Sequence, residues 1–324
     1  MSSIIDRSGR RDGLSVVVLR TDHVEVAIAP EAGGKILDLI DPASGMNLLW
    51  HNPRIPLSAT YAGAPFDDVW CGGWDQMFPT DVPCELDGNT HHDHGDLWIG
   101  PWAWEVVSDD GERAQLRMQR HSASLPCRAE LSIGVERSSS QVRVHLSLHN
   151  LGTHRMRFIW NQHIAHAVAP GSRVHLPAGS FDVAGSTPSR AGAADRVSWP
   201  VHDGLDLSRI PGPELGVTEF LCTNDLGGGW CAVTHPGVGV GVRLGFDPAV
   251  FRTPWLWGVF GGWRGHELLL TELCTSRPGS LATAVADGSA ASLGPEESLA
   301  TEVVVTIGHD FDPEAPGDED PFGG

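Results

Sequence analysis

The segment CRAELSIGVERSSSQVRVHLSLHN, residues 127–150, decides the fold class of this chain. Its two ends alternate apolar and polar residues with a period of two, and three serines separate them. Such alternation is typical of a half-buried β-strand, and a short polar cluster between two alternating runs predicts a tight turn. The same pattern occurs just upstream in AWEVVS (103–108) and AQLRMQR (114–120). These residues therefore predict an antiparallel β-meander.

Strand patterns continue on both sides of this meander. A glycine pair at 33–34 is followed by a predicted hairpin that ends at Trp50, and residues 156–168 read as one strand. One or two helical turns are predicted near Leu281, and residues 180–215 are predicted to be a long surface excursion. Further strands are predicted at 14–20, 23–30, 36–40, 172–179, 230–236, 239–246, 254–262, 266–274 and 300–308.

Many strands in series without alternating helices predict an all-β fold, a large antiparallel sandwich. No internal repeat or change in composition suggests a second domain, so residues 1–312 are predicted to form a single β-sandwich domain. Residues 313–324 are acidic and rich in proline and glycine, and we expect them to be a disordered tail.

Composition excludes several classes of function. The formal net charge of −19 argues against nucleic acid and anionic membrane surfaces as partners. The six cysteines are scattered without a C-x-x-C pair, which favours reduced thiols. No apolar run is long enough to span a bilayer, and the first residues lack a signal peptide, so a cytoplasmic location is expected. Lys35 is the single lysine, which disfavours Schiff-base chemistry.

Residues 70–104 are the first candidate for a site. They contain five tryptophans together with His91, His92 and His94, but no clear helical or strand period, which favours a loop over a site. Indole faces beside carboxylates and imidazoles suit a sugar, whose C–H faces stack and whose hydroxyls need partners. His92 and His94 alternate and so offer a possible metal pair. No second cluster with ligand spacing accompanies them, and no metal is predicted.

Two later segments supply candidate acid–base groups. Asn161 and His163 would lie on one face of a strand, because successive side chains alternate. Glu272 lies in an otherwise apolar strand, where burial raises the pKa of a carboxyl and makes it a plausible general base. The alternative for Glu272 is a salt bridge to an arginine such as Arg264 or Arg277.

Taken together, these segments resemble the aldose 1-epimerase (galactose mutarotase-like) superfamily, in a branch with the pattern GGWxxMFPx…HGxLW. The resemblance implies a β-supersandwich that interconverts sugar anomers without a metal or other cofactor. It covers the chain from about residue 13 to residue 308. The matching pieces are Gly33–Ile36, Gly72–Pro79, His94–Trp98, Trp160–His163 and Thr271–Thr275.

The resemblance also implies roles for individual residues. Glu272 would take the proton of the anomeric hydroxyl, His163 would protonate the ring oxygen, and His94 would orient that oxygen. Arg54 is the candidate for the arginine that known members place in an early loop, and Asp247 for an aspartate that contacts a sugar hydroxyl. The residues expected to bind the sugar are Trp74, Trp98, Asn161, Asp247, Trp257 and Arg54.

The expected substrate is a hexose or an acidic or sulfonated hexose derivative, since arginines suit the recognition of anionic groups. The protein is expected to be a monomer or a homodimer whose partner is a small sugar. Two alternatives stay open. One is a non-catalytic carbohydrate-binding protein, and the other is a different sugar-active enzyme, a lyase or an epimerase, with or without a metal.

Overall fold

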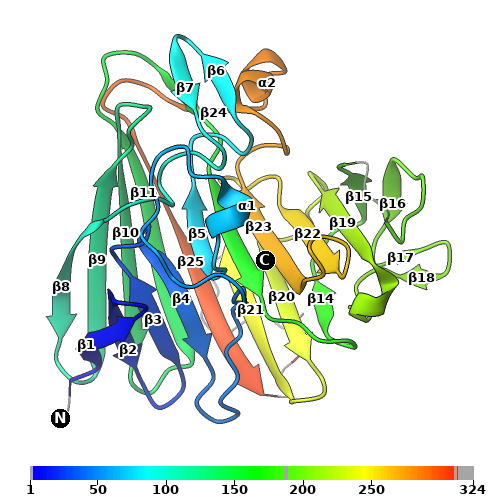
Figure 1. Ribbon diagram of the computed structural model, residues 1–324, viewed down its shortest axis with the longest axis horizontal. Helices are drawn as coiled ribbons and strands as arrows, with labels where there is room; N and C mark the ends of the chain where they lie inside the picture. The colour runs from blue at the N-terminus through cyan, green and yellow to red at the C-terminus, as the bar shows by residue number, and fades with distance from the viewer. Residues whose placement is uncertain (1–2, 186–188, 310–311, 313–324) are drawn as a thin grey trace.

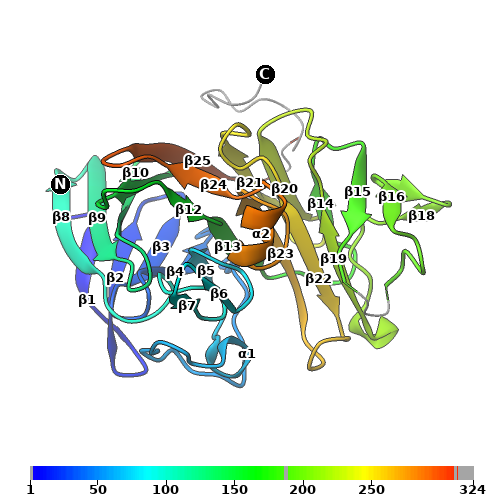
Figure 2. The same ribbon diagram turned by 90° about the horizontal axis from the view of Figure 1, so that it is seen from above.

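The alternating segments build two large antiparallel sheets that pack face to face (Figures 1 and 2). The computed structural model describes residues 3–185, 189–309 and 312, so the predicted acidic tail, 313–324, lies outside the described residues. This arrangement confirms the predicted all-β antiparallel sandwich. Among the described residues, no helix is long and apolar enough to cross a membrane.

The first sheet has eleven strands and carries the candidate catalytic residues. In spatial order, the strands are β1 (Ile5–Arg11), β2 (Leu14–Arg20), β3 (Glu25–Ala29), β4 (Lys35–Ile40), β5 (Trp74–Met77), β13 (Asn161–His166), β23 (Glu267–Cys274), β22 (Trp255–Phe260), β19 (Val217–Cys222), β15 (Ser180–Val183) and β16 (Arg196–Ser198).

The second sheet has eight strands and contains the predicted meander. In spatial order, they are β14 (Arg173–His175), β20 (Trp230–His235), β21 (Val240–Phe246), β25 (Ser298–His309), β11 (Gln141–Asn150), β10 (Cys127–Glu136), β9 (Arg113–His121) and β8 (Ala103–Asp109). The four strands from β8 to β11 are neighbours in sequence order, which confirms the meander. Leu131 and Leu146 face each other across β10 and β11, and both are buried in the core between the sheets. Burying one such side chain stabilises the fold by about 1.5–3 kcal/mol.

Small elements complete the fold. They are α1 (Phe66–Val69), α2 (Leu281–Ala286), the 3₁₀ turn η1 (Pro213–Leu215), and the strand pairs β6 (Cys84–Leu86) with β7 (Asn89–His91), β12 (Met156–Phe158) with β24 (Ala291–Leu293), and β17 (Val201–His202) with β18 (Leu205–Asp206). The helix α2 confirms the turns predicted near Leu281, and the Ser280 side chain caps it by accepting a hydrogen bond from Thr283 N. The region 180–215 is not only a surface excursion, since β15 and β16 extend the first sheet.

The segment predicted as one strand over residues 156–168 is two strands in different sheets. Between them, the backbone N–H of Ile159 binds Pro79 O, and that of Trp160 binds Thr275 Oγ1. These hydrogen bonds interrupt the ladder, so β12 pairs with β24 whereas β13 enters the first sheet. The predicted hairpin ending at Trp50 has only its first strand, β4, because the returning chain makes isolated bridges.

The expected loop over residues 70–104 contains a central strand. All four residues of β5 are buried, so the sequence shows no polar alternation there. On either side of β5, the chain runs over the face of the first sheet that points away from the second. Figure 2 shows α1 on that side, opposite β25. This outer face of β13 and β23 is where the candidate site lies.

Candidate active site

The site begins with two residues that face each other across neighbouring strands. His163 on β13 and Glu272 on β23 are directly paired in the antiparallel register, so their side chains project from the same face of the sheet. Asn161 lies two residues before His163 on that face, and its Nδ2 donates a hydrogen bond to Glu272 Oε2. The next residues in each strand, Ile164 and Leu273, belong to the core. This confirms the prediction that Asn161 and His163 share a face.

Above this pair lies a cavity of about 210 Å³. His163 and Glu272 form its floor, and each is only 4% exposed. The remaining walls come from the chain around α1, from the loops that follow β5 and β7, and from strands β19 and β22 with the loop after β22. The lining residues are Phe66, Asp67, Trp70, Asp81, Val82, His94, His163, Phe220, Trp257, Trp263 and Glu272.

His94 is fixed over the floor by packing and by its backbone. Its ring stacks on Phe66 with centroids 3.7 Å apart and an interplanar angle of 7°, and it stands nearly perpendicular to the His163 ring at 5.7 Å. Its Nδ1 lies 2.9 Å from Asp93 Oδ1. The following residue must be glycine, because a Cβ on Gly95 would lie 1.9 Å from Phe78 O. The His-Gly pair thus holds the imidazole against the neighbouring loop.

Electrostatics separate the protonation states of the three central groups. Burial and the charge on Asp81 raise the pKa of Glu272 to about 8, against smaller opposing effects of Asn161 and His94. Burial lowers the pKa of His163 well below its usual value, and the charges of His94 and Lys35 act in the same direction. Burial also disfavours the charged form of His94, but the hydrogen bond with Asp93 and the nearby carboxylates outweigh it and raise its pKa. His94 is therefore the better proton carrier of the two histidines.

Asp81 is the main cavity residue that the sequence did not reveal. It is half-buried, and its Oδ2 accepts a hydrogen bond of 3.2 Å from Gly279 N. Burial raises the pKa of Asp81, and the charge on His94 opposes this shift. The signal available in the sequence was its position directly after the Met77–Thr80 segment of the aromatic stretch. Phe66 was also missed, because no period marks the four-residue helix that carries it.

The tryptophans proposed as sugar walls are divided by the structure. Trp257 lines the cavity. Trp98 is buried behind Phe66, at 4.9 Å edge to face, and its Nε1 donates to Asp93 O, so it supports the wall without lining it. Trp74 lies in the core on the opposite face of the sheet, where its Nε1 donates to Gln162 Oε1 at 3.1 Å. Successive side chains of β5 point to opposite faces of the sheet, and Trp74 points to the face away from the site. The sequence alone does not give the register that decides this direction.

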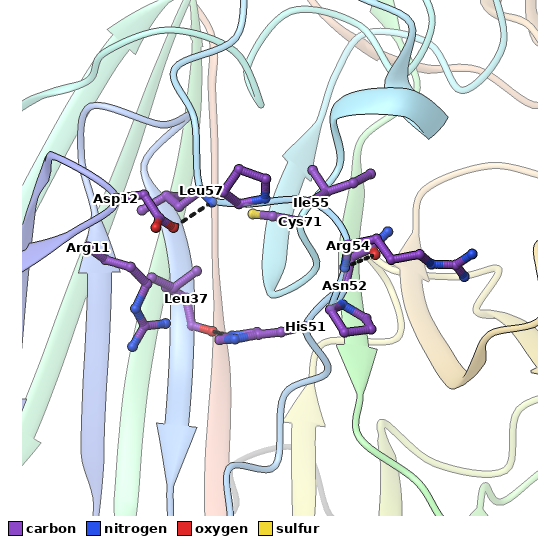
Figure 3. A pocket seen from close by; sticks show the side chains of 11 residues that line it. Arg11, Asp12, Leu37, His51, Asn52, Arg54, Ile55, Leu57 and Cys71 are labelled. Carbon is purple, nitrogen blue, oxygen red and sulfur yellow. Dashed lines mark hydrogen bonds between the residues drawn. The ribbon is translucent and has the colours of Figure 1, made fainter.

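Arg54 and Asp247 also lie outside the cavity. The Arg54 guanidinium donates to Arg264 O at 2.7 Å and contacts the His266 ring. It lines a separate pocket of about 330 Å³ together with Arg11 and His51 (Figure 3). The Asp247 carboxylate accepts a hydrogen bond of 2.8 Å from Ala249 N and so stabilises the turn after β21. Neither residue reaches the paired His163 and Glu272.

The alternative of a salt bridge for Glu272 is wrong. Arg264 pairs with Asp68 at 2.8 Å, and Arg277 pairs with Asp182 at 2.7 Å. Glu272 is bound instead by the neutral amide of Asn161. A buried carboxyl without a cationic partner costs stability, which is typical of a functional group.

The three histidines of the 70–104 segment point to different surroundings. His91 is buried with its Nδ1 3.2 Å from Ser124 Oγ, His92 is exposed beside Gly63, and His94 enters the cavity. Within the ranges that the structure describes, no three His, Cys, Asp or Glu side chains form a group able to hold a metal ion.

The fold is that of galactose mutarotase-like proteins. A putative aldose 1-epimerase from Klebsiella pneumoniae superposes with a TM-score of 0.73 at 16% identity, over 92% of this chain and 80% of that one. A galactose mutarotase-like protein from Lactobacillus casei gives 0.62 at 14% identity, over 90% and 100% of the two chains. The Slr1438 protein from Synechocystis gives 0.66 at 18% identity, over 95% and 99%. No family model and no curated protein matches the sequence.

Proposed function

We propose that this protein is a mutarotase that interconverts the α and β anomers of an aldose. The observation that carries the proposal is the direct pairing of His163 and Glu272 on the floor of one aromatic-walled cavity, with His94 above them. Ring opening needs a base at the anomeric hydroxyl and an acid at the ring oxygen, and groups with separated pKa values meet that need. The likeness in fold to aldose 1-epimerase-type proteins supports the same reaction.

The reaction balances with two proton transfers and no redox change. The Glu272 carboxylate takes the proton of the C1 hydroxyl, the C1–O5 bond breaks as C1 becomes an aldehyde, and O5 takes a proton from an imidazolium. Rotation about the C1–C2 bond presents the other face of the aldehyde to O5. Closure then returns both protons and releases the other anomer. The indoles of Trp257 and Trp263 supply stacking surface for the ring.

We further propose that His94 is the acid and that neutral His163 orients the ring oxygen. The family resemblance implies the reverse assignment, but the two pKa shifts favour His94 as the group that holds a proton near neutral pH. In His94→Asn, the fall in exchange rate at high pH should disappear, because it reports deprotonation of the acid. In His163→Asn, that fall should persist. A high-pH fall that survives in His94→Asn and vanishes in His163→Asn would restore the resemblance-based roles.

Anomer exchange measured by NMR tests the reaction itself. Wild-type protein should accelerate exchange of at least one aldose, and Glu272→Gln should reduce the rate to that of buffer. Glu267→Gln is the matched control, since Glu267 lies on the same strand but outside the cavity. If no aldose exchanges faster with wild-type protein, the proposal fails. Thermal stabilisation by a sugar without exchange would instead indicate a carbohydrate-binding protein.

The proposal also includes a cytoplasmic location and a monomeric or homodimeric state. Fractionation of cells and light scattering of the purified protein test these two points. Secretion, or a larger assembly, would contradict them.

A further inference from the structure

The charges around the candidate cavity are one-sided. Among the described residues, the lining includes three carboxyl groups, Asp67, Asp81 and Glu272, but no lysine or arginine. His94 is the one lining group that favours a positive charge, and the adjacent Asp93 balances it at 2.9 Å. Because Glu272 is largely protonated near neutral pH and Asp67 lies 3.9 Å from the Arg264 guanidinium, the negative charge that faces a bound molecule is mainly that of Asp81.

The cations nearest to the cavity are held by other groups. Lys35 pairs with Asp75 and donates a hydrogen bond of 2.7 Å to Gly72 O beneath the site. The Arg264 guanidinium lies on the Trp263 ring, pairs with Asp68 at 2.8 Å and with the Asp67 carboxylate at 3.9 Å, and donates to Asp67 O. Arg54 is engaged with Arg264 O in the neighbouring pocket. None of the three is placed to neutralise an anionic substituent on a sugar.

The walls that accompany these carboxyl groups are aromatic. Trp70, Trp257, Trp263, Phe66 and Phe220 line the same 210 Å³. Ring faces attract cations through their quadrupole, and this attraction is stronger in a site shielded from water. Carboxylates beside aromatic faces form a typical environment for a bound ammonium group.

We propose that the cavity selects an aldose that carries a protonated amine, an amino sugar, with Asp81 as the carboxylate that binds the ammonium group. This inference rests on the proposed mutarotase function and names the substrate class of that site. It replaces the expected acidic or sulfonated hexose, because an anionic substituent would face the Asp81 carboxylate, and no lysine or arginine is among the described residues that line the cavity.

An ammonium group in this position would also favour the active carboxylate form of the base, Glu272. The charge on Asp81 is one of the causes that raise the pKa of Glu272 to about 8, which leaves Glu272 largely protonated near neutral pH. A cation bound to Asp81 cancels that repulsion and favours the carboxylate form of Glu272. A neutral sugar provides no such charge. The amino sugar is thus expected to gain in turnover as well as in binding.

The test compares hexoses that differ in the charge of one substituent at C2 or C6. Anomer exchange is measured for 2-amino-2-deoxyglucose, 6-amino-6-deoxyglucose, N-acetylglucosamine, glucose and glucuronate. The two amines flank the reacting C1–O5 bond on either side. We expect kcat/KM for one amine to exceed that for glucose by at least tenfold, the N-acetyl sugar to behave as a neutral sugar, and glucuronate to exchange slowest.

Substitution of Asp81 identifies the selective group. In Asp81→Asn, the amine-to-glucose ratio of kcat/KM should fall towards one, and the ratio removes any effect common to both sugars. Asp68→Asn is the matched control, because Asp68 is acidic and close by but pairs with Arg264 outside the lining. That variant should keep the wild-type ratio.

The outcomes separate the preference from the reaction. Equal exchange of amine and glucose, or faster exchange of glucuronate, overturns the amino-sugar proposal while the mutarotase function stands. If no sugar exchanges, the mutarotase function fails, and calorimetric binding of the same sugars still decides the preference. Tighter binding of the amine, lost in Asp81→Asn, supports it, and equal binding overturns it.

Discussion

The two faces of the strands β13 and β23 serve opposite purposes. On the inner face, Gln162 and Gln76 exchange side-chain hydrogen bonds of 2.6 and 2.8 Å and also accept indole N–H groups. On the outer face, Asn161 Oδ1 and His163 Nδ1 are buried and have no partner among the described residues. Satisfied buried polar groups specify a fold, whereas unsatisfied ones lower stability and are typical of sites that await a ligand.

This difference shows that the loss of stability occurs at the outer face, around Glu272. The pKa of Glu272 is raised to about 8 from 4.5, so folding favours the neutral carboxyl. Protonation of Glu272 in the folded state therefore makes its full contribution to stability at low pH. That contribution is lost as the pH rises from 4.5 towards 8. The inner amides do not titrate, whereas His166 on the same face has a pKa that burial lowers to about 3 and a buried Nδ1 without a partner among the described residues, so the contrast holds for the Gln76–Gln162 pair.

The largest expected effect comes from the outer face. Glu272→Gln should lower the anomer exchange rate by about 10²–10⁴-fold, because it removes the general base. The same variant should be more stable than wild type above pH 4.5, with a gain that grows up to about pH 8 and then stays constant. Thermal unfolding across this pH range measures the gain. A variant that is less stable than wild type at pH 9 would contradict the contrast between the faces.

Substitutions on the inner face should lower stability and leave the exchange rate nearly unchanged. Gln76→Leu leaves the Trp160 indole N–H and an amide N–H of Gln162 unpaired, at a cost of about 1–3 kcal/mol for each group. Chemical denaturation measures this loss, and exchange by the folded fraction should stay near the wild-type rate. The double variant Gln76→Leu/Gln162→Leu should lose less than the sum of the two single changes. Loss of exchange in folded Gln76→Leu would break the division of roles.

A smaller effect is expected for the pH profile. The charge on Asp81 helps to raise the pKa of Glu272, so Asp81→Asn should lower it and move the acidic limb of the exchange profile to lower pH. The limb reports the base, because exchange rises as Glu272 loses its proton. Rates for a neutral sugar from pH 5 to pH 9 measure the displacement. A limb that stays in place would show that Asp81 does not act on Glu272.

The smallest effect is expected for Arg54. Its guanidinium is held by Arg264 O and His266 in the pocket of Figure 3, so Arg54→Ala should change kcat/KM by less than about threefold, or roughly 0.6 kcal/mol. Steady-state exchange kinetics check this. A large rise in KM would return Arg54 to the substrate-binding residues.

The fold was predictable where strands have one polar face. The meander from β8 to β11 alternates visibly, because one of its faces is exposed to solvent. Strand β5 could not be predicted in this way, since Trp74–Met77 is buried on both faces and therefore shows no polar alternation. The division of residues 156–168 depends on hydrogen bonds to Pro79 and Thr275, which are distant in sequence.

The site was predictable only in part for the same physical reason. Glu272 stood out as an acid within apolar residues, and strand parity placed Asn161 beside His163. Phe66 and Asp81 reach the cavity from loops without a period, so only the folded chain reveals them. Trp74 belonged to a matching motif, yet its strand directs the indole into the core.

The central claim is that the outer face of β13 and β23 holds a buried carboxyl that acts as the base. Titration of the Glu272 side-chain carboxyl by ¹³C NMR, with Glu272→Gln to assign its signal, tests this most directly. The account predicts a midpoint near pH 8 that coincides with the acidic limb of the exchange profile. A midpoint near 4.5, or a limb that does not follow the titration, would contradict it.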